Sequence, residues 1–198
     1  ASISNGSSSP FYRCSKIEEI TVPNYMVSNI YGYEPSGIFS YSKTTIATVN
    51  FVGEITSIAS SAFNGFTALK SITIPSNVTS IGDYAFYCCT SLSGKLTIPE
   101  NVTKVGQNAF YNCSKITEVE FLSKGKLKTI DAYAFGNLSL ITSITIPEGV
   151  KEIRSGAFRD CTELKKVYLP TTIASISNGS SSPFYRCSKI EEITVPNY

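Results

Sequence analysis

Catalytic chemistry in this sequence has to come from carboxylates and thiols, because its 198 residues include 15 Asp and Glu, six Cys and no His. Histidine is the usual general base near neutral pH and the commonest metal ligand, so triads with His and His-based zinc sites are excluded. Two carboxylates can act as general acid and base, but most of them, such as Glu118 and Glu120, occupy repeated positions beside predicted strands. We interpret them as a solvated surface, and we predict no catalytic residue, no metal, no cofactor and no enzymatic activity.

Five of the six cysteines recur at one position, three residues after a phenylalanine: Cys14, Cys89, Cys113, Cys161 and Cys187. Phe66 and Leu138 fill the same position in other copies. A position that accepts Cys, Phe or Leu is typical of a core, where free Cys behaves as a small buried hydrophobe. We therefore favour buried thiols over disulfides or a metal site, for which the spacing gives no support. Cys88 is the one thiol expected to face outward.

Six Asn-x-Ser/Thr sequons are candidate N-glycosylation sites: Asn5, Asn77, Asn101, Asn112, Asn137 and Asn178. The motif matters only in a secreted protein. Asn77 and Asn101 belong to an "NVT" turn that is part of the repeat, so the motif would recur there whether or not a glycan is attached. Asn5 and Asn178 lie in a Ser-rich loop that has no packing role. The sequence leaves occupancy open.

The elements that position these residues belong to an internal repeat with a period of about 23–28 residues. The period is marked by anchoring phenylalanines, of which we predict six as core anchors: Phe63, Phe86, Phe110, Phe135, Phe158 and Phe184. Two clear copies read "LKSITIPSNVTSIGDYAFYCCTS" and "ITSITIPEGVKEIRSGAFRDCTE". A repeat of this length indicates stacked structural units, here about eight rungs in one domain over residues 1–198.

Within a rung, "SITIP" alternates polar and apolar residues before a proline and predicts a short strand. Ile72 and Ile74 should face inward, and Ser71 and Thr73 outward. The apolar stretch that follows is too short for a full helix and indicates a tight turn or a second short extended segment; its residues are Val78, Ile81, Ala85 and Phe86. One rung cannot bury its apolar face alone, so we expect the rungs to stack through a parallel sheet as a solenoid.

The string of strand, "IP", "NVT", "IG", "AF" and then Cys three residues later resembles the BspA-type leucine-rich repeat of bacterial and protist surface proteins. The resemblance covers nearly the whole chain. It implies an α/β-type repeat solenoid that is mostly β: a right-handed leucine-rich-repeat solenoid with one parallel sheet and short turns or extended segments on the other side. It also implies an extracellular or cell-surface, non-enzymatic protein used in adhesion or protein binding.

The chain departs from this pattern at residues 26–48, which form an irregular rung, and it ends by repeating itself. Residues 174–198 are identical to residues 1–25, which defines a 173-residue super-repeat. We interpret this as tandem duplication, with the chain as an excerpt of a longer array. The predicted function is a long solenoid or filament, with or without a coat of covalent N-glycans, whose partner is the next unit, joined end to end.

The alternative function is an adhesin domain that binds host or neighbouring-cell proteins. The outward strand positions form a mixed, mild surface without clustered aromatic residues. Candidate protein-binding residues are Tyr31, Tyr33 and Tyr41 in the irregular rung and Tyr168 on a strand, although packing of an odd rung explains the first three more simply.

Composition excludes two other classes of partner. The net charge is +2 and the Lys and Arg residues are scattered, so we expect no nucleic-acid binding. The apolar stretches include only a few residues each, far fewer than a membrane-spanning helix needs, and a targeting signal, if there is one, is expected outside this chain.

Overall fold

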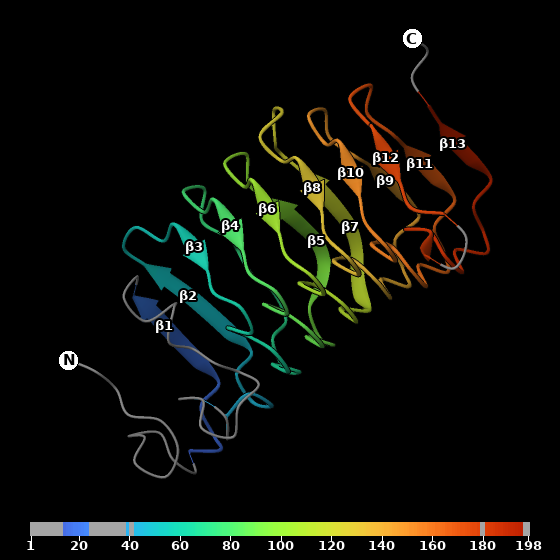
Figure 1. The fold of residues 1–198 in the computed structure, drawn as a ribbon. Helices are drawn as coiled ribbons and strands as arrows, with labels where there is room; N and C mark the ends of the chain where they lie inside the picture. Colours follow the sequence, from blue (N-terminus) through green and yellow to red (C-terminus); the bar gives the residue numbers. More distant parts are fainter. Residues whose placement is uncertain (1–13, 24–38, 40–41, 179–180, 196–198) are drawn as a thin grey trace.

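The computed structural model describes residues 14–23, 39, 42–178 and 181–195, and it shows a solenoid of short parallel strands (Figure 1). The described residues contain no α-helix, and none of their segments forms a helix long and apolar enough to cross a membrane. The predicted fold class, a mostly β solenoid with parallel strand pairing, is confirmed. Most of the irregular rung at residues 26–48 lies outside the described residues.

One side of the solenoid, which we call side A, carries the strands that correspond to "SITIP" in the repeat. They pair in parallel as β1 with β2, β5 with β7, and β9 with β11 and β13. Their bounds are β1 (Glu19–Pro23), β2 (Thr48–Val52), β5 (Ser93–Ile98), β7 (Lys115–Phe121), β9 (Ser143–Thr145), β11 (Lys166–Tyr168) and β13 (Glu192–Thr194).

The second side, side B, is a continuous six-stranded parallel sheet in the order β3-β4-β6-β8-β10-β12. Its strands are very short: β3 (Ser57–Ile58), β4 (Ser80–Ile81), β6 (Lys104–Val105), β8 (Thr129–Ile130), β10 (Glu152–Ile153) and β12 (Ser175–Ile176). In these strands the first residue faces solvent and the second faces the core, except in β12, where both are exposed. The predicted second extended segment is therefore present, and a tight turn follows it.

The anchoring phenylalanines form a continuous stack through the interior, from Phe63 to Phe184. Successive ring centroids lie 5.0–5.6 Å apart with interplanar angles of 6–16°. The first five rings are fully buried, and Phe184 at the last turn is partly buried. Stacking places each ring in contact with the equivalent ring of the next rung, so every rung contributes to the core of its neighbours.

The turns that hold the phenylalanines from Phe63 to Phe158 have two left-handed positions each, two residues before and two residues after the ring. Around Phe110, for example, these are Asn108 (φ 54°) and Asn112 (φ 62°). Asn tolerates this backbone better than most residues. The same two positions recur around Phe86, Phe135 and Phe158, so the turn keeps its shape while its side chains vary.

Side A is interrupted between β2 and β5 and again between β7 and β9, which the repeat did not predict. Residues 71–73 of the best sequence copy form no strand, although the equivalent Ser143–Thr145 does. The next rung contains an extra residue, and β5 shifts register by a bulge between Gly94 and Lys95, with Gly94 at φ +77°. At the start of this stretch of side A, Lys70 N–H donates to Ala47 O and Ser93 N–H donates to Lys70 O, both at 3.1 Å. The strand predicted at residues 71–75 is therefore wrong.

Candidate functional site

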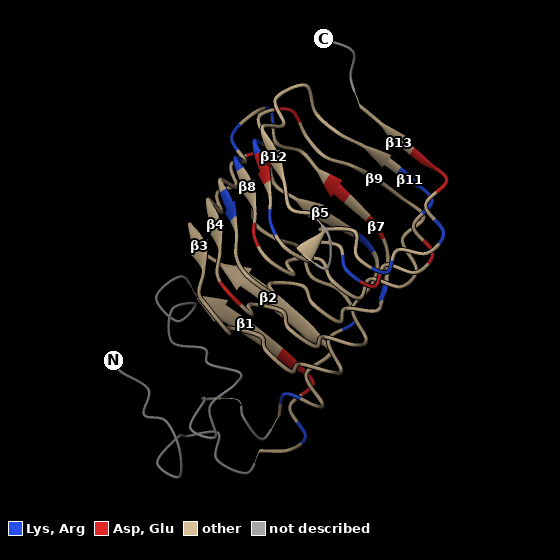
Figure 2. Ribbon diagram, turned by 45° about the vertical axis from the view of Figure 1, so that its right-hand side comes forward, with Lys and Arg blue, Asp and Glu red and all other residues tan. Residues whose placement is uncertain are grey.

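The outward face of side A carries charged residues that neutralise one another between neighbouring strands. Lys95 Nζ lies 3.1 Å from both Glu118 and Glu120, and these hydrogen bonds raise the pKa of Lys95. Lys166 lies 3.5 Å from Glu192 on the next strand. Figure 2 shows Lys and Arg interspersed with Asp and Glu over the described strands. Exposed pairs of this kind contribute little to stability.

Tyr168 on β11 is half-buried between Thr145 and Thr194 in the strand register. The other candidate protein-binding tyrosines, Tyr31, Tyr33 and Tyr41, lie outside the described residues. Whether the four tyrosines form one binding patch therefore stays a prediction, and only Tyr168 lies among the described residues.

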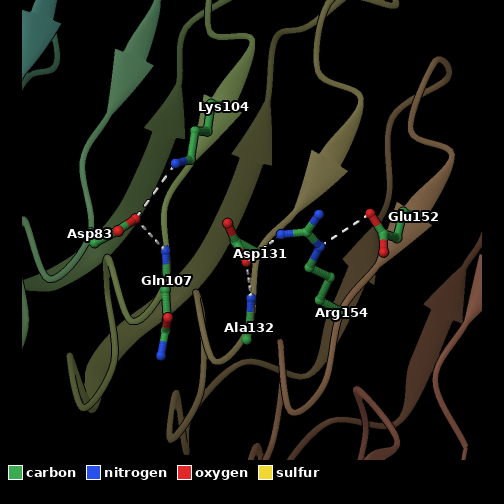
Figure 3. A network of polar contacts seen from close by, with 7 residues as sticks. All are labelled: Asp83, Lys104, Gln107, Asp131, Ala132, Glu152 and Arg154. Carbon is green, nitrogen blue, oxygen red and sulfur yellow. Dashed lines mark hydrogen bonds and ion pairs between the residues drawn. The ribbon is translucent and has the colours of Figure 1, made fainter.

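Side B carries a ladder of charged side chains at the ends of its strands (Figure 3). Arg154 contacts Asp131 at 3.2 Å and Glu152 at 3.1 Å, and the hydrogen bond to Asp131, followed by that to Glu152, raises the pKa of Arg154. Asp131 also accepts the Ala132 N–H at 2.8 Å. These carboxylates are held by ion pairs and hydrogen bonds between neighbouring rungs of the ladder.

Asp83 makes the same kind of contact at an earlier rung of this ladder. Its Oδ1 accepts the Gln107 N–H of the next turn at 3.0 Å and lies 3.7 Å from Lys104 Nζ. Within the described part of the chain, no three Cys, Asp or Glu side chains come together in a group that could hold a metal ion.

Four of the five thiols at the repeated position lie inside the solenoid, as predicted, whereas Cys14 is only partly buried. Cys89, Cys113, Cys161 and Cys187 are buried, and each donates to the carbonyl oxygen of the anchor phenylalanine one rung earlier, at 3.0–3.4 Å. Burial raises the pKa of Cys89 and Cys161 well above the usual range. All six cysteines are free thiols, and Cys88 is only partly buried.

Three of the predicted sequon asparagines use their amide groups within the fold. Asn137 Nδ2 donates to Asn112 Oδ1 at 2.7 Å, and Asn112 Nδ2 contacts Cys88 Sγ at 3.4 Å. Asn101 Nδ2 donates to Ser76 O at 2.9 Å. A glycan is joined to this same nitrogen, so occupancy at these positions would disturb the contacts.

The other sequons differ in their surroundings. Asn77 and Asn178 are exposed, in a turn and in the Ser-rich loop respectively. Asn5 lies outside the described residues. Among the described asparagines, Asn77 and Asn178 are therefore the most accessible acceptors.

A row of tyrosines along the turns, Tyr84, Tyr87, Tyr111 and Tyr133, was missed at the level of the sequence; we call it the tyrosine ridge. Tyr87 stacks on Tyr111 with centroids 5.5 Å apart and an interplanar angle of 11°. The ring centroids of Tyr84 and Tyr87 lie 5.5 Å apart, and those of Tyr111 and Tyr133 lie 6.5 Å apart. The signal was present in the repeat, because these tyrosines stand two residues before or one residue after an anchor phenylalanine.

A shallow depression of about 400 Å³ adjoins one end of the tyrosine ridge, lined by Ser61, Asn64, Tyr84 and Tyr87. Burial raises the pKa of Tyr87, with a smaller contribution from Cys88. Tyr is enriched among the residues that dominate binding, and amide and hydroxyl groups orient ligands in pockets. This depression is a candidate for a contact with another molecule.

The two copies of the duplicated segment occupy equivalent strands at opposite ends of the solenoid (Figure 1). Glu19–Pro23 forms β1, and Glu192–Thr194, from the second copy of the same sequence, forms β13. Ile20 and Val22 are 6% and 1% exposed, whereas Ile193 and Val195 are 48% and 53% exposed. The same sequence is therefore core at one end and surface at the other.

The cover over the first copy is the segment of residues 42–52, and we call the contact between residues 14–23 and 42–52 the N-terminal seam. Ile20 pairs with Val49 and Val22 with Phe51 in the register of β1 and β2. At the other end, Ile176, Ile193 and Val195 are exposed and Ile190 is partly buried; we call these four the C-terminal face. The apolar composition of this face matches what the N-terminal seam buries.

Comparison with known proteins identifies the repeat. Residues 35–140 and 90–198 match the family model described as BspA type leucine rich repeat region, with six copies. No curated protein matches the chain.

Several solved structures share the fold. The chain is similar to a leucine-rich repeat protein from Bacteroides ovatus (TM-score 0.66, 26% identity, 93% of this chain and 50% of that one). It is similar to the leucine-rich repeat protein of T. pallidum (TM-score 0.65, 26% identity, 89% and 74%). It also resembles a leucine rich cell surface protein from Faecalibacterium prausnitzii (TM-score 0.59, 22% identity, 92% and 61%). The chain thus spans from half to three quarters of the length of these proteins.

Proposed function

The chain belongs to the BspA-type leucine-rich repeat family, and we propose that it is a structural protein whose 173-residue units continue one another as a long solenoid or filament. Its role in this proposal is mechanical or protective, without catalysis. The family and the sequons support a location outside the cell or at its surface, with N-glycans on accessible loops.

One observation carries this proposal: the duplicated segment forms an equivalent strand at both ends, covered at one and uncovered at the other. Ile20 is 6% exposed under β2, and Ile193 is 48% exposed. A further unit placed after β13 would bury Ile193 as β2 buries Ile20. At a strand spacing of about 4.8 Å, the seven rungs of one unit advance the sheet by roughly 34 Å before curvature.

A two-unit chain, in which residues 1–173 are followed by residues 1–198, tests the proposal. The middle copy of the duplicated segment should then be covered on both sides, and the protein should be a single rod. Small-angle X-ray scattering should give a maximum dimension longer than that of the 198-residue chain by roughly the 34 Å of one unit. Two separate bodies joined by a flexible connection would contradict the filament.

The alternative function is adhesion through the tyrosine ridge. The depression lined by Tyr84 and Tyr87, which is beside Asn64, favours this second candidate. It predicts binding to a protein on a host or neighbouring cell. The double variant Tyr84→Ser, Tyr87→Ser should abolish adhesion to cells while the rod length stays unchanged, and the matched side A variant Lys95→Ser should leave adhesion intact.

A further inference from the structure

The matching ends of the solenoid give separate copies of this chain a way to join. We infer that residues 187–195 of one copy take the place of residues 14–23 of a second copy against residues 42–52 of that second copy. The inference rests on the proposed function, because it uses the same seam, and it adds a mechanism of assembly that needs no covalent continuation.

The hydrogen bonds of the N-terminal seam define what the incoming segment must offer. Thr45 Oγ1 donates to Ile17 O at 2.7 Å, and Ala47 N–H donates to Glu18 O at 2.7 Å. Asn50 Nδ2 donates to Glu19 Oε1 at 2.6 Å. Each accepting group has an identical counterpart in the second copy of the segment, where the equivalent residues are Ile190, Glu191 and Glu192.

The apolar contacts are matched in the same way. Val49 and Phe51 of β2 lie opposite Ile20 and Val22. In the exchanged arrangement they lie opposite Ile193 and Val195, which are about half exposed in the single chain. The exchange therefore buries Ile193 and Val195 of one copy and keeps the core of the other copy intact.

The incoming segment is already held in its strand conformation. Residues Lys166–Tyr168 pair with Glu192–Thr194, and Glu191 N–H donates to Lys165 O at 2.9 Å. Lys189 Nζ lies 2.7 Å from Glu163. Little conformational entropy is lost when this segment binds, whereas the displaced residues 14–23 gain conformational freedom. The contacts across the seam are the same before and after the exchange. The small entropy loss of the incoming segment and the entropy gain of the displaced one therefore favour exchange, and the entropy of association opposes it.

Simple stacking of β13 on β1 without exchange is a poorer fit. It would place two identical strands side by side, with Glu192 beside Glu19 and Glu191 beside Glu18. Like charges on directly opposed positions destabilise a sheet. In the exchanged arrangement Glu192 instead meets Thr48 and Asn50, as Glu19 does in the single chain.

The contact joins the C-terminal face of one copy to the N-terminal seam of the next. Each growing chain of copies therefore keeps one uncovered C-terminal face and one N-terminal seam that has not exchanged. A heterologous contact of this kind that does not close generates an open chain of copies. We expect the 198-residue protein to form such chains at high concentration, after incubation just below its melting temperature, where the terminal rung opens. Light scattering coupled to size-exclusion chromatography measures the mass of the products.

Two matched double variants give opposite results. Ile193→Asp with Val195→Asp changes residues that are exposed in the single chain, so the monomer stays folded, but association should weaken by more than about tenfold because the seam would bury two carboxylates. Ile20→Asp with Val22→Asp makes the same change in the first copy. It weakens the internal seam and should shift association to lower concentration, since the wild-type residues 187–195 then compete better.

The inference fails if the wild-type chain stays monomeric after this incubation, or if multimers form equally well with the Ile193 and Val195 changes. Circular dichroism of each variant confirms that the solenoid is present. The two-unit chain separates the two proposals. If it is a continuous rod while the single chain stays monomeric, the filament stands and the exchange is wrong.

Discussion

Phe86 and Phe110 stack with their ring centroids 5.0 Å apart and an interplanar angle of 6°, and both are fully buried. The two rings belong to successive rungs, so the contact joins residues 24 positions apart in the sequence. Each ring also stacks on the rung beyond, to Phe63 on one side and Phe135 on the other. The stack makes the stability of each rung depend on that of its neighbours.

Phe86→Ala should therefore lower the free energy of unfolding by about 3–5 kcal/mol, because it leaves a cavity between two rings. Urea unfolding followed by circular dichroism measures the change. Phe184→Ala is the matched control, and its effect should be smaller because Phe184 is only partly buried at the last turn. An unchanged unfolding midpoint for Phe86→Ala would remove its role as an anchor.

Cys161 should react slowly with a thiol reagent in the folded protein. It is buried, its thiol donates to Phe135 O at 3.4 Å, and burial raises its pKa, so the reactive thiolate is scarce. Peptide mass mapping after brief labelling at neutral pH measures the extent at each cysteine. Cys88, which is partly buried, should label faster. Equal rates at the two positions would place Cys161 outside the core.

Glu148 should give the solenoid a small acid-sensitive contribution. Its carboxylate accepts the Thr171 N–H at 3.0 Å and the Thr171 hydroxyl at 2.8 Å, and these bonds lower the pKa of Glu148. A lowered pKa means that the stabilisation is present above the pKa of the unfolded chain, about 4.3, and is lost as the pH falls through the folded value.

Glu148→Gln should flatten this pH dependence in thermal melts between about pH 5 and pH 3. Glu100→Gln is the control, because Glu100 stands at the same turn position in an earlier rung and leaves the Thr171 contact untouched. If both variants change the profile equally, the Thr171 hydrogen bonds are not the cause.

Gly136→Ala should destabilise the tyrosine ridge, because a Cβ at this position would lie 2.8 Å from the Tyr111 ring. Overpacking of this size costs about 1–3 kcal/mol, and near-ultraviolet circular dichroism should report the altered tyrosines. Adding Tyr111→Ala should recover part of the loss, since it removes the opposing ring. A strictly additive double variant would show that the ring is not what limits this position.

Glycan occupancy should follow the accessibility of the amide nitrogens. In a eukaryotic secretory host, we expect Asn77 and Asn178 to be occupied ahead of Asn112 and Asn137, whose side chains bond to each other at 2.7 Å. Peptide mass mapping after release of the glycans measures each site. High occupancy at Asn112 would show that the asparagine contact forms only after the modification step or not at all.

The repeat in the sequence was enough to predict the solenoid, the phenylalanines that anchor its core and four of the five thiols expected to be buried. Each rung places a given position in the same surroundings, so the residues found there across the copies report its burial. The exchange of Cys for Phe66 and Leu138 predicted a core slot, and Cys89, Cys113, Cys161 and Cys187 are all buried there.

Other features were decided by the contacts between rungs. Residues 71–75, predicted as a strand, form none, and the next rung carries a register shift at Gly94; pairing depends on the neighbouring rung and not on a segment's own sequence. The tyrosine ridge arises because stacking brings Tyr87 beside Tyr111 from 24 positions away. Ile20 and Ile193 stand in identical local sequences, yet only the first is covered, since burial depends on the rung packed against a residue rather than on the residue's own segment.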